Sequence, residues 1–245
     1  MTGMTCGLKG PILTQSYLKE GMMMEEINRR EFLKVSAATG AILSVAPGLS
    51  WADEQKAIQL LKPQAGSGSP FLQLLWKRMS ARELSPEPLP VEVLSNLLWA
   101  AFGINRPDGH RTAPTASNRQ EIDIYVTLAT GLYLYDAKAS LLNPIQGEDI
   151  RAMTGRQPFV KDAPVNLVYV ADFSKMGTTA SNEEKILLSA AATGLISENV
   201  YLYCASEGLS TVVRANMDKP ALASAMKLKP DQKIILAQTV GYPKK

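Results

Sequence analysis

Residues 77–82 of the chain place three cationic side chains around one hydroxyl group. The segment reads Lys-Arg-Met-Ser-Ala-Arg and follows a short apolar run. Guanidinium groups and a serine hydroxyl are donors that suit phosphate oxygens, so this pattern is typical of an anion site. The same residues also fit a helix that ends in a solvated basic turn. The segment alone does not decide between a phosphate site and a solvated helix end.

The composition of the chain limits the chemistry that it can carry. Its 245 residues are 46% hydrophobic and 20% charged, as in ordinary globular proteins, and the formal net charge is +3. A charge this small gives no electrostatic footprint for nucleic acid. His110 is the only histidine, and Cys6 and Cys204 are the two cysteines. We therefore expect no nucleic-acid partner, no internal disulfide and no histidine-rich metal site.

Residues 1–52 have the organisation of a leader with an export signal. The pattern R-R-x-F-L-K at residues 29–34 precedes a mildly apolar stretch at 35–46, and small residues then lead to Ala52. A membrane span needs about 20 apolar residues, so we expect a signal peptide cleaved after Ala52 and no stable membrane span. The pattern resembles a twin-arginine signal, which predicts export, with a periplasmic location. The alternative is an uncleaved amphipathic helix.

The chain beyond the leader predicts a polar arm at residues 53–68 and one domain at residues 69–245. Prolines and apolar spacing indicate helices, β-rich apolar runs indicate strands, and the polar residues 104–120 indicate a loop. Helices and strands do not alternate strictly, so the sequence favours the α+β class over a doubly wound sheet. We expect helices at 69–79, 89–103, 183–206 and 219–228, and strands at 122–129, 131–136, 163–173 and 232–243.

Four stretches of this domain resemble, in order and spacing, the FMN-dependent nitroreductase family, and within it the SagB/thiazoline-oxidase-like branch. They are KRMSAREL (77–84), APTASNRQEIDIYV (113–126), LISENVYLYCASEGLST (195–211) and VGYP (240–243). The resemblance covers about residues 60–243. It implies a three-layer α+β fold, with a central and mostly antiparallel sheet flanked by helices, in a domain-swapped homodimer.

The resemblance also implies where FMN binds. Arg78, Ser80 and Arg82 would hold the phosphate and ribityl end, and Lys77 would face solvent. The turn after the long helix would lie at the redox edge of the flavin, where backbone N–H groups can bond to N5 and O4. Alternatively, the glycine of this turn is an ordinary helix C-cap. The loop in APTASN would cover the flavin from the second subunit. The loop residues are Pro114, Thr115, Ala116, Ser117 and Asn118, and the turn residues are Glu207, Gly208 and Leu209.

Four further residues are less well defined by the family pattern. Gln157 is a candidate contact of the flavin pyrimidine ring. Arg214 stands where many relatives have an apolar residue, and it fits either a phosphate or substrate contact or a surface cation. The chain ends at Lys244 and Lys245 without a longer basic tail, so these two lysines either reach the phosphate or form a frayed terminus.

The function implied by the resemblance is that of an FMN oxidoreductase of ping-pong type. Hydride would pass through flavin N5 from NAD(P)H or another donor to a small acceptor such as a nitroaromatic or a quinone, so no protein side chain need be the catalytic residue. Export conflicts with a nicotinamide donor, so an exported flavin oxidase or dehydrogenase is the alternative. Two alternatives are not enzymes. One is a flavin protein that carries electrons without turning over a substrate, and the other is a structural domain that has lost its cofactor.

Overall fold

The computed structural model of the protein describes residues 70–245, and the predicted leader (1–52) and polar arm (53–68) lie outside this range. The predicted helices and strands are all present, with ends shifted by a few residues. No helix within the described part of the chain is long and apolar enough to cross a membrane. The helices are α2 (Pro70–Lys77), α3 (Val91–Phe102), α4 (Asn182–Glu207) and α5 (Lys219–Ala225).

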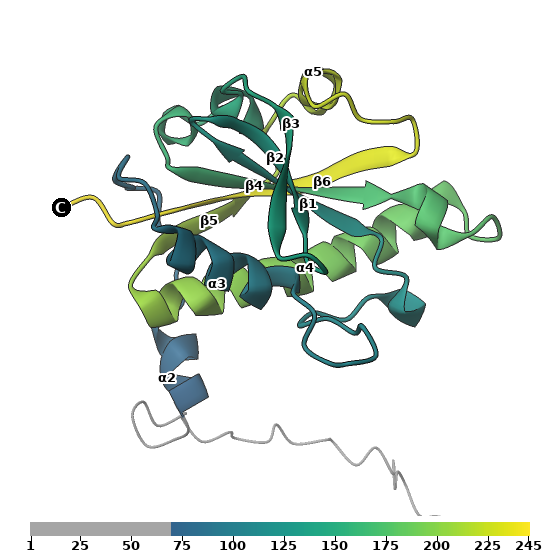
Figure 1. Cartoon of the computed structure of the whole chain (residues 1–245), viewed down its shortest axis with the longest axis horizontal. Coiled ribbons are helices and arrows are strands. Elements are labelled where there is room, and N and C mark those ends of the chain that lie inside the picture. The colour runs from purple at the N-terminus through teal and green to yellow at the C-terminus, as the bar shows by residue number, and fades with distance from the viewer. Residues whose placement is uncertain (1–69) are drawn as a thin grey trace, which may run out of the picture. The chain divides into compact units, whose positions relative to one another are not determined.

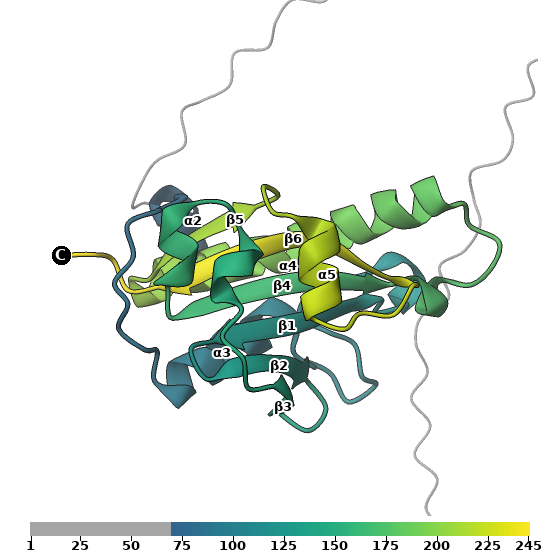
Figure 2. The ribbon, with the colours of Figure 1, turned by 90° about the horizontal axis from the view of Figure 1, so that it is seen from above.

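A six-stranded sheet forms the centre of the domain, in the order β3-β2-β1-β4-β6-β5, and every pairing in it is antiparallel (Figure 2). The sequence did not predict β3 or β5. β3 contains Pro144 and is largely exposed, which only an edge strand tolerates. The strands are β1 (Ile122–Leu128), β2 (Gly131–Asp136), β3 (Leu141–Gln146), β4 (Val165–Asp172), β5 (Ser210–Arg214) and β6 (Gln232–Gly241).

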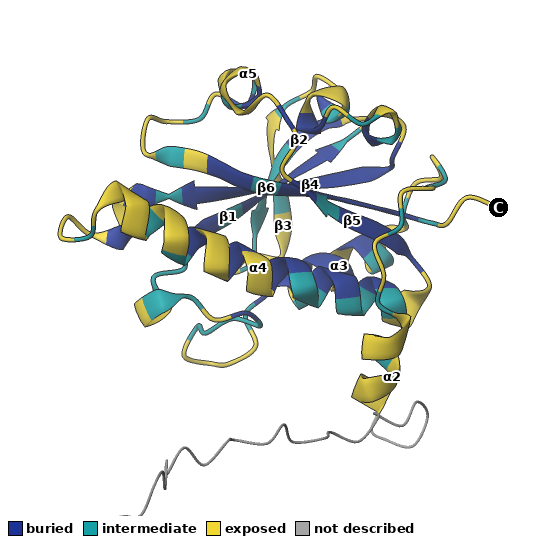
Figure 3. Cartoon of the chain, turned by 180° about the vertical axis from the view of Figure 1, so that it is seen from behind, coloured by how far each residue is buried: buried dark blue, intermediate teal, exposed yellow. Residues whose placement is uncertain are grey.

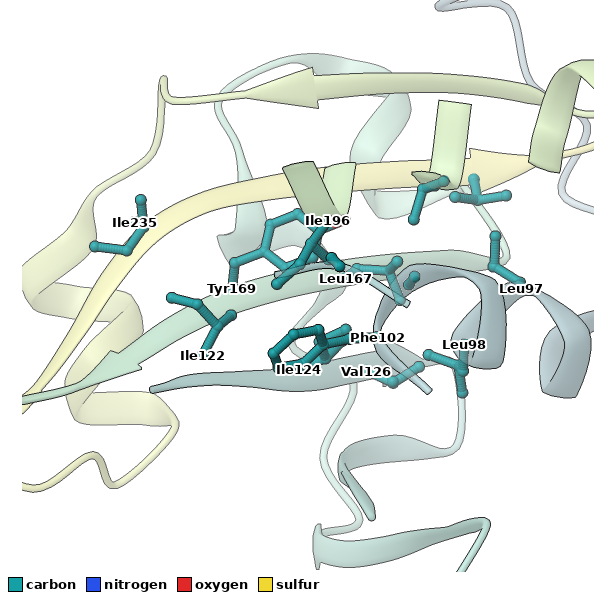
Figure 4. Packing of buried hydrophobic residues seen from close by; sticks show 14 of the residues in the cluster. Leu97, Leu98, Phe102, Ile122, Ile124, Val126, Leu167, Tyr169, Ile196 and Ile235 are labelled. Atoms are coloured by element: carbon teal, nitrogen blue, oxygen red, sulfur yellow. The ribbon is translucent and has the colours of Figure 1, made fainter. Parts of the chain in front are cut away.

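Helices cover both faces of the sheet, as the three-layer prediction requires. In Figure 1, α3 and α4 lie below the sheet, and α5 lies above it together with short 3-10 turns. The larger apolar cluster joins α3 and α4 to the sheet, with Leu97 and Phe102 from α3 and Ile196 from α4 (Figure 4). A second cluster on the opposite face includes Leu222 of α5. Helices α3 and α4 therefore fix one face of the sheet, and the 3-10 turns and α5 fix the other.

Helix α4 begins and ends where side-chain and backbone chemistry require it to. The Ser181 side chain accepts a hydrogen bond from the Glu184 N–H at the first turn, and two acidic residues in that turn suit the positive end of the helix dipole. Gly208 ends the helix in the left-handed conformation, with φ of 68°. The helix end therefore stands at a defined place beside β5, which begins two residues later.

Candidate functional site

The predicted phosphate segment is held between the chain terminus and β5. Arg78 N–H bonds to the Leu74 carbonyl, which continues the last turn of α2, and Ala81 N–H bonds to the Thr211 carbonyl at 2.9 Å. The next residues pair antiparallel with the end of the chain, through a bridge from Leu84 to Pro243. Ala81 and Leu84 thus fix the backbone on either side of Arg82, whose side chain is exposed.

The end of the chain is part of this arrangement. Lys244 N–H donates to the Glu83 carbonyl at 3.2 Å, so its backbone is tied to the phosphate segment, while the side chains of Lys244 and Lys245 are exposed. The frayed-terminus reading therefore does not hold for the Lys244 backbone. A contact of either lysine with a cofactor remains a prediction.

Tyr201 of α4 brings two of the predicted residues together. The Ser80 hydroxyl lies 2.8 Å from the Tyr201 hydroxyl, and the Arg78 guanidinium lies 5.4 Å from the centroid of the Tyr201 ring. The Val213 N–H donates to the same hydroxyl at 3.0 Å. When Tyr201 donates its proton to Ser80, the Ser80 O–H is left free to donate to an anion. Arg78 and Ser80 therefore both lie beside Tyr201.

A cavity of about 260 Å³ opens between this segment, the end of α4 and the start of β5. A Cβ at Gly208 would meet no atom within 4 Å, so the turn faces open space. Lys77 lines the cavity although it is exposed, so the prediction that Lys77 faces only solvent is incomplete. The lining residues are Lys77, Met79, Ala81, Tyr201, Cys204, Ala205, Gly208, Leu209, Ser210, Thr211 and Pro243.

The backbone amides of the turn after α4 are engaged within the chain. The N–H groups of Gly208 and Leu209 both bond to the Cys204 carbonyl, the latter at 2.8 Å. The expectation that these amides point freely into the site is therefore not met in this structure. Gly208 has the C-cap role that was the alternative reading, and its left-handed φ favours glycine for that reason.

The loop that carries Pro114, Thr115, Ala116, Ser117 and Asn118 is preformed by its own hydrogen bonds. Thr115 Oγ1 accepts from the Gln120 N–H at 2.9 Å, and Asn118 Oδ1 accepts from Gln120 Nε2 at 3.1 Å. Arg111 Nε donates to Gln120 Oε1 at 2.7 Å and its Nη1 donates to the Phe102 carbonyl. Because Pro114, Ser117 and Asn118 remain exposed, the loop presents an ordered outer surface.

This loop and the phosphate segment lie at different ends of α4 within one chain. The Gln120 carbonyl accepts a hydrogen bond from Lys175, and the neighbouring Met176 contacts Ser189 in the first half of α4. The phosphate segment instead meets α4 near Cys204. A helix rises about 1.5 Å per residue, so Ser189 and Cys204 are about 22 Å apart. Figures 1 and 3 agree, since the loop leaving α3 runs away from α2.

Gln157 and Arg214 meet on the opposite face of the sheet from α4. The Gln157 Oε1 atom is buried and has no hydrogen-bond partner among the described residues. Arg214 is buried and donates to the carbonyl of Thr154 and to the side chains of Asn166 and Thr239. The surface reading of Arg214 is therefore wrong, and its guanidinium is committed to internal partners.

Sequence reasoning assigned no role to Tyr201 and did not foresee the internal network of Arg214. Tyr201 lies within the quoted stretch LISENVYLYCASEGLST, about two turns before the glycine that ends α4. Its partner Ser80 is 121 positions away, so spacing along the chain gave no signal of the contact.

The cavity is lined by one thiol, that of Cys204, and it is not a nucleophile at neutral pH. Burial raises the pKa of the Cys204 thiol to about 12, because the interior disfavours the thiolate. Among residues 70–245, no group of three or more His, Cys, Asp or Glu side chains could hold a metal ion. The side chains at the site can therefore bind an anion and shape a pocket, and redox chemistry there needs a bound group.

We predict that Cys204 resists alkylation in the folded protein. With a pKa of about 12 its thiolate fraction at pH 8 is roughly one part in ten thousand, against about a quarter for an exposed thiol. Carboxymethylation with iodoacetamide, followed by mass spectrometry, should be about a thousandfold slower than in guanidinium chloride. Equal rates in the folded and unfolded protein would contradict this assignment.

The nitroreductase family model matches residues 75–242, which is more than half of the chain. A Methanocaldococcus jannaschii protein assigned as a nitroreductase is 29% identical over 149 residues, covering 57% of this chain and 75% of that protein. The crystal structure of a Ralstonia eutropha JMP134 protein with the same assignment is 44% identical, with a TM-score of 0.69, over 76% of this chain and 89% of the other. A Desulfovibrio desulfuricans structure in complex with FMN is 22% identical, with a TM-score of 0.54, over 73% and 89%. The chain therefore belongs to the nitroreductase family.

Proposed function

We propose that this protein is an FMN-dependent oxidoreductase that transfers hydride between a donor and a small organic acceptor. The observation that carries the proposal is the Arg78–Ser80–Tyr201 arrangement, because Tyr201 also lines the cavity that extends to the open turn at Gly208. This pairs donors for a phosphate with space for a ring system. The FMN bound in the Desulfovibrio desulfuricans relative supports this choice of flavin.

The phosphate end of FMN fits the donors that the segment offers. A phosphate near neutral pH carries nearly two negative charges and needs charge-assisted donors. Arg78 supplies one guanidinium, Ser80 supplies a hydroxyl that Tyr201 holds in place, and the exposed Arg82 can add a second guanidinium. Because Lys77 lines the same cavity, it adds positive charge nearby.

The ring end of FMN fits the open turn. Gly208 leaves room for close approach where a side chain would intrude. Gln157 does not line this cavity and its Oε1 atom is buried, so its contact with the flavin pyrimidine ring remains a prediction of the family resemblance. When bound, the flavin supplies two-electron chemistry at N5, with NAD(P)H as the donor and a nitroaromatic or quinone as the acceptor. The residues of this chain bind it and orient it.

The separation of the two segments supports a homodimer. The loop at residues 114–118 leads into Gln120, whose Lys175 contact lies beside the Met176–Ser189 pair, and Ser189 is about 22 Å along α4 from Cys204. The loop is therefore better placed to cover a flavin in a second chain than one in its own. Exposed apolar side chains on two helices supply material for an interface: none of the residues of α2 is buried, and the outer face of α4 is exposed (Figure 3). These side chains are Phe71, Leu72, Leu75 and Trp76 of α2, and Ile186, Leu187 and Leu195 of α4.

The leader motif supports an exported member of the family, located in the periplasm, and the four stretches of the domain support the SagB-like branch. The pattern R-R-x-F-L-K at residues 29–34 is the basis for the twin-arginine signal. Nicotinamide donors are scarce outside the cytoplasm, so this location favours a flavin oxidase or dehydrogenase that takes hydride from its substrate. The donor test below separates that direction from the NAD(P)H-dependent one.

We predict that residues 53–245 purify as a yellow protein whose flavin is released on denaturation and identified as FMN. If NAD(P)H is the donor, anaerobic NADPH or NADH will bleach the absorption near 450 nm. A yellow protein that neither nucleotide bleaches indicates the oxidase direction or a carrier. A colourless protein that takes up no added FMN would refute the proposal.

We predict that the double variant Arg78→Ala and Arg82→Ala folds but loses FMN. Removing both guanidinium groups takes away the charge-assisted donors for the phosphate, so the affinity should fall at least a hundredfold. Fluorescence titration with FMN measures the loss, and circular dichroism confirms the fold. Lys138→Ala with Lys229→Ala is the matched control, because it removes two exposed cations elsewhere. Equal affinity in the two double variants would remove the phosphate assignment.

We predict that the mature chain sediments as a dimer when loaded with FMN. Each site needs one phosphate segment and the loop of a second chain, so flavin content and dimer content should rise together. Analytical ultracentrifugation with detection at 450 nm follows both. A stable monomer that carries flavin would contradict the shared site.

A further inference from the structure

The outer edge of β5 is covered by two groups from other parts of the chain. β5 is the last strand in the order of the described sheet, so β6 is its only neighbour there. On the other side, the Thr211 carbonyl accepts from the Ala81 N–H at 2.9 Å, and the Val213 N–H donates to the Tyr201 hydroxyl at 3.0 Å. Residues two apart in a strand lie about 7 Å from each other. The phosphate segment and Tyr201 are therefore neighbours on one strand edge.

The burial of Tyr201 decides which way its hydrogen bond to Ser80 runs. The Ser80 Oγ atom, at 2.8 Å, is the one acceptor in reach of the Tyr201 proton among the described residues. Tyr201 is 6% exposed, whereas Ser80 is exposed. A buried O–H group without an acceptor is costly, but an exposed O–H group can bond to water. Because the Tyr201 oxygen already accepts from Val213, its proton goes to Ser80.

This direction makes Ser80 a donor to whatever lies outside the chain. The Ser80 O–H has no other acceptor among residues 70–245, and the Arg78 guanidinium lies 5.4 Å from the centroid of the same tyrosine ring. A hydrogen bond to a charged acceptor is about twice as strong as one to a neutral acceptor. An oriented O–H group beside a cation is therefore better matched to a terminal phosphate than to an uncharged alcohol.

We propose that Tyr201 is a positioning residue that makes the site prefer FMN over riboflavin, the same flavin without the phosphate. This rests on the proposed FMN function. Tyr201 acts through Ser80: its hydroxyl turns the Ser80 proton toward the ligand, beside the Arg78 guanidinium. The Val213 N–H holds the phenol oxygen in place, so the preference for the phosphate depends on how α4 docks on β5.

Two variants interrupt this arrangement at different atoms. Tyr201→Phe removes the hydroxyl and keeps the ring beside Arg78. Ser80→Ala removes the proposed donor itself, at an exposed position. Tyr203→Phe is the matched control, because it also removes one phenol hydroxyl from α4. The Tyr203 hydroxyl donates to the Val93 carbonyl at 3.2 Å, and Tyr203 does not line the cavity beside Tyr201.

The dissociation constants of FMN and riboflavin, measured by fluorescence titration of the full-length apoprotein, test the proposal. We expect Tyr201→Phe and Ser80→Ala each to lower the preference for FMN over riboflavin about tenfold, since each removes an oriented bond to a charged group. Tyr203→Phe should keep the parental preference. The double variant Tyr201→Phe with Ser80→Ala should lower it no further than Ser80→Ala alone, because both changes act on one donor.

A purely structural role of Tyr201 gives a different result. Tyr201→Phe would then lower the melting temperature and weaken both flavins alike, and an unchanged preference would overturn the proposal. Should Tyr201→Phe not fold, Ser80→Ala decides, because Tyr201 is proposed to act only through the Ser80 proton.

The failure of this proposal is distinguishable from the failure of the FMN assignment. If the parent prefers FMN and Tyr201→Phe keeps that preference, the role of Tyr201 is refuted while the proposed function stands. If the parent binds neither flavin, the proposed function fails, and the inference fails with it.

Discussion

The hydroxyl of Tyr201 joins three segments that are far apart in the sequence. It meets Ser80 of the phosphate segment, accepts a hydrogen bond from the Val213 amide of β5, and belongs to α4. A phenol can serve both neighbours because its oxygen accepts one hydrogen bond while its proton forms another. The position of Ser80, and the stacking of Arg78 on the same ring, therefore depend on α4 and β5 being in register. The placement of Arg78 and Ser80 is therefore a consequence of how the C-terminal part of α4 docks beside β5.

The length of α4 imposes the second constraint on this protein. A straight helix of 26 residues keeps the phosphate segment and the loop at residues 114–118 apart, because each packs near a different end of it. Neither segment can bend across that distance, since one is tied to the C-terminal residues and the other to Arg111 and Gln120. The phosphate segment of one chain could meet the loop of a second chain in a dimer. The interface of such a dimer would cover the apolar side chains that are exposed on α2 and α4. The hydrogen bonds that keep the phosphate segment and the loop apart also hold each of them in a defined conformation.

The sequence predicted those parts of the fold that depend on local chemistry. The apolar runs predicted β1, β2, β4 and β6, and the glycine after Glu207 predicted the end of α4. Both depend on the types of residues that are neighbours in the sequence, so the sequence alone shows them. β3 was missed because it is an exposed edge strand with a proline, and β5 because five residues give too short a pattern. The family resemblance named Arg78 and Ser80 as candidates, and the structure brings both to Tyr201. Tyr201 and the partners of Arg214 were missed because those contacts join residues 25 to 121 positions apart.

The two polar centres of the site differ in how they balance charge, and this difference has a functional meaning. Arg78 is half-buried and stacks on an aromatic ring, so water can solvate it until an anion replaces that water. Arg214 is sealed in the interior, where solvent cannot compensate it and only neutral dipoles from Thr154, Asn166 and Thr239 surround it. An exposed cation contributes mainly to affinity, because it interacts with a permanent charge such as a phosphate. Arg214 instead ties the end of β5 to the neighbouring segments through Thr154, Asn166 and Thr239, so its charge is committed to the fold.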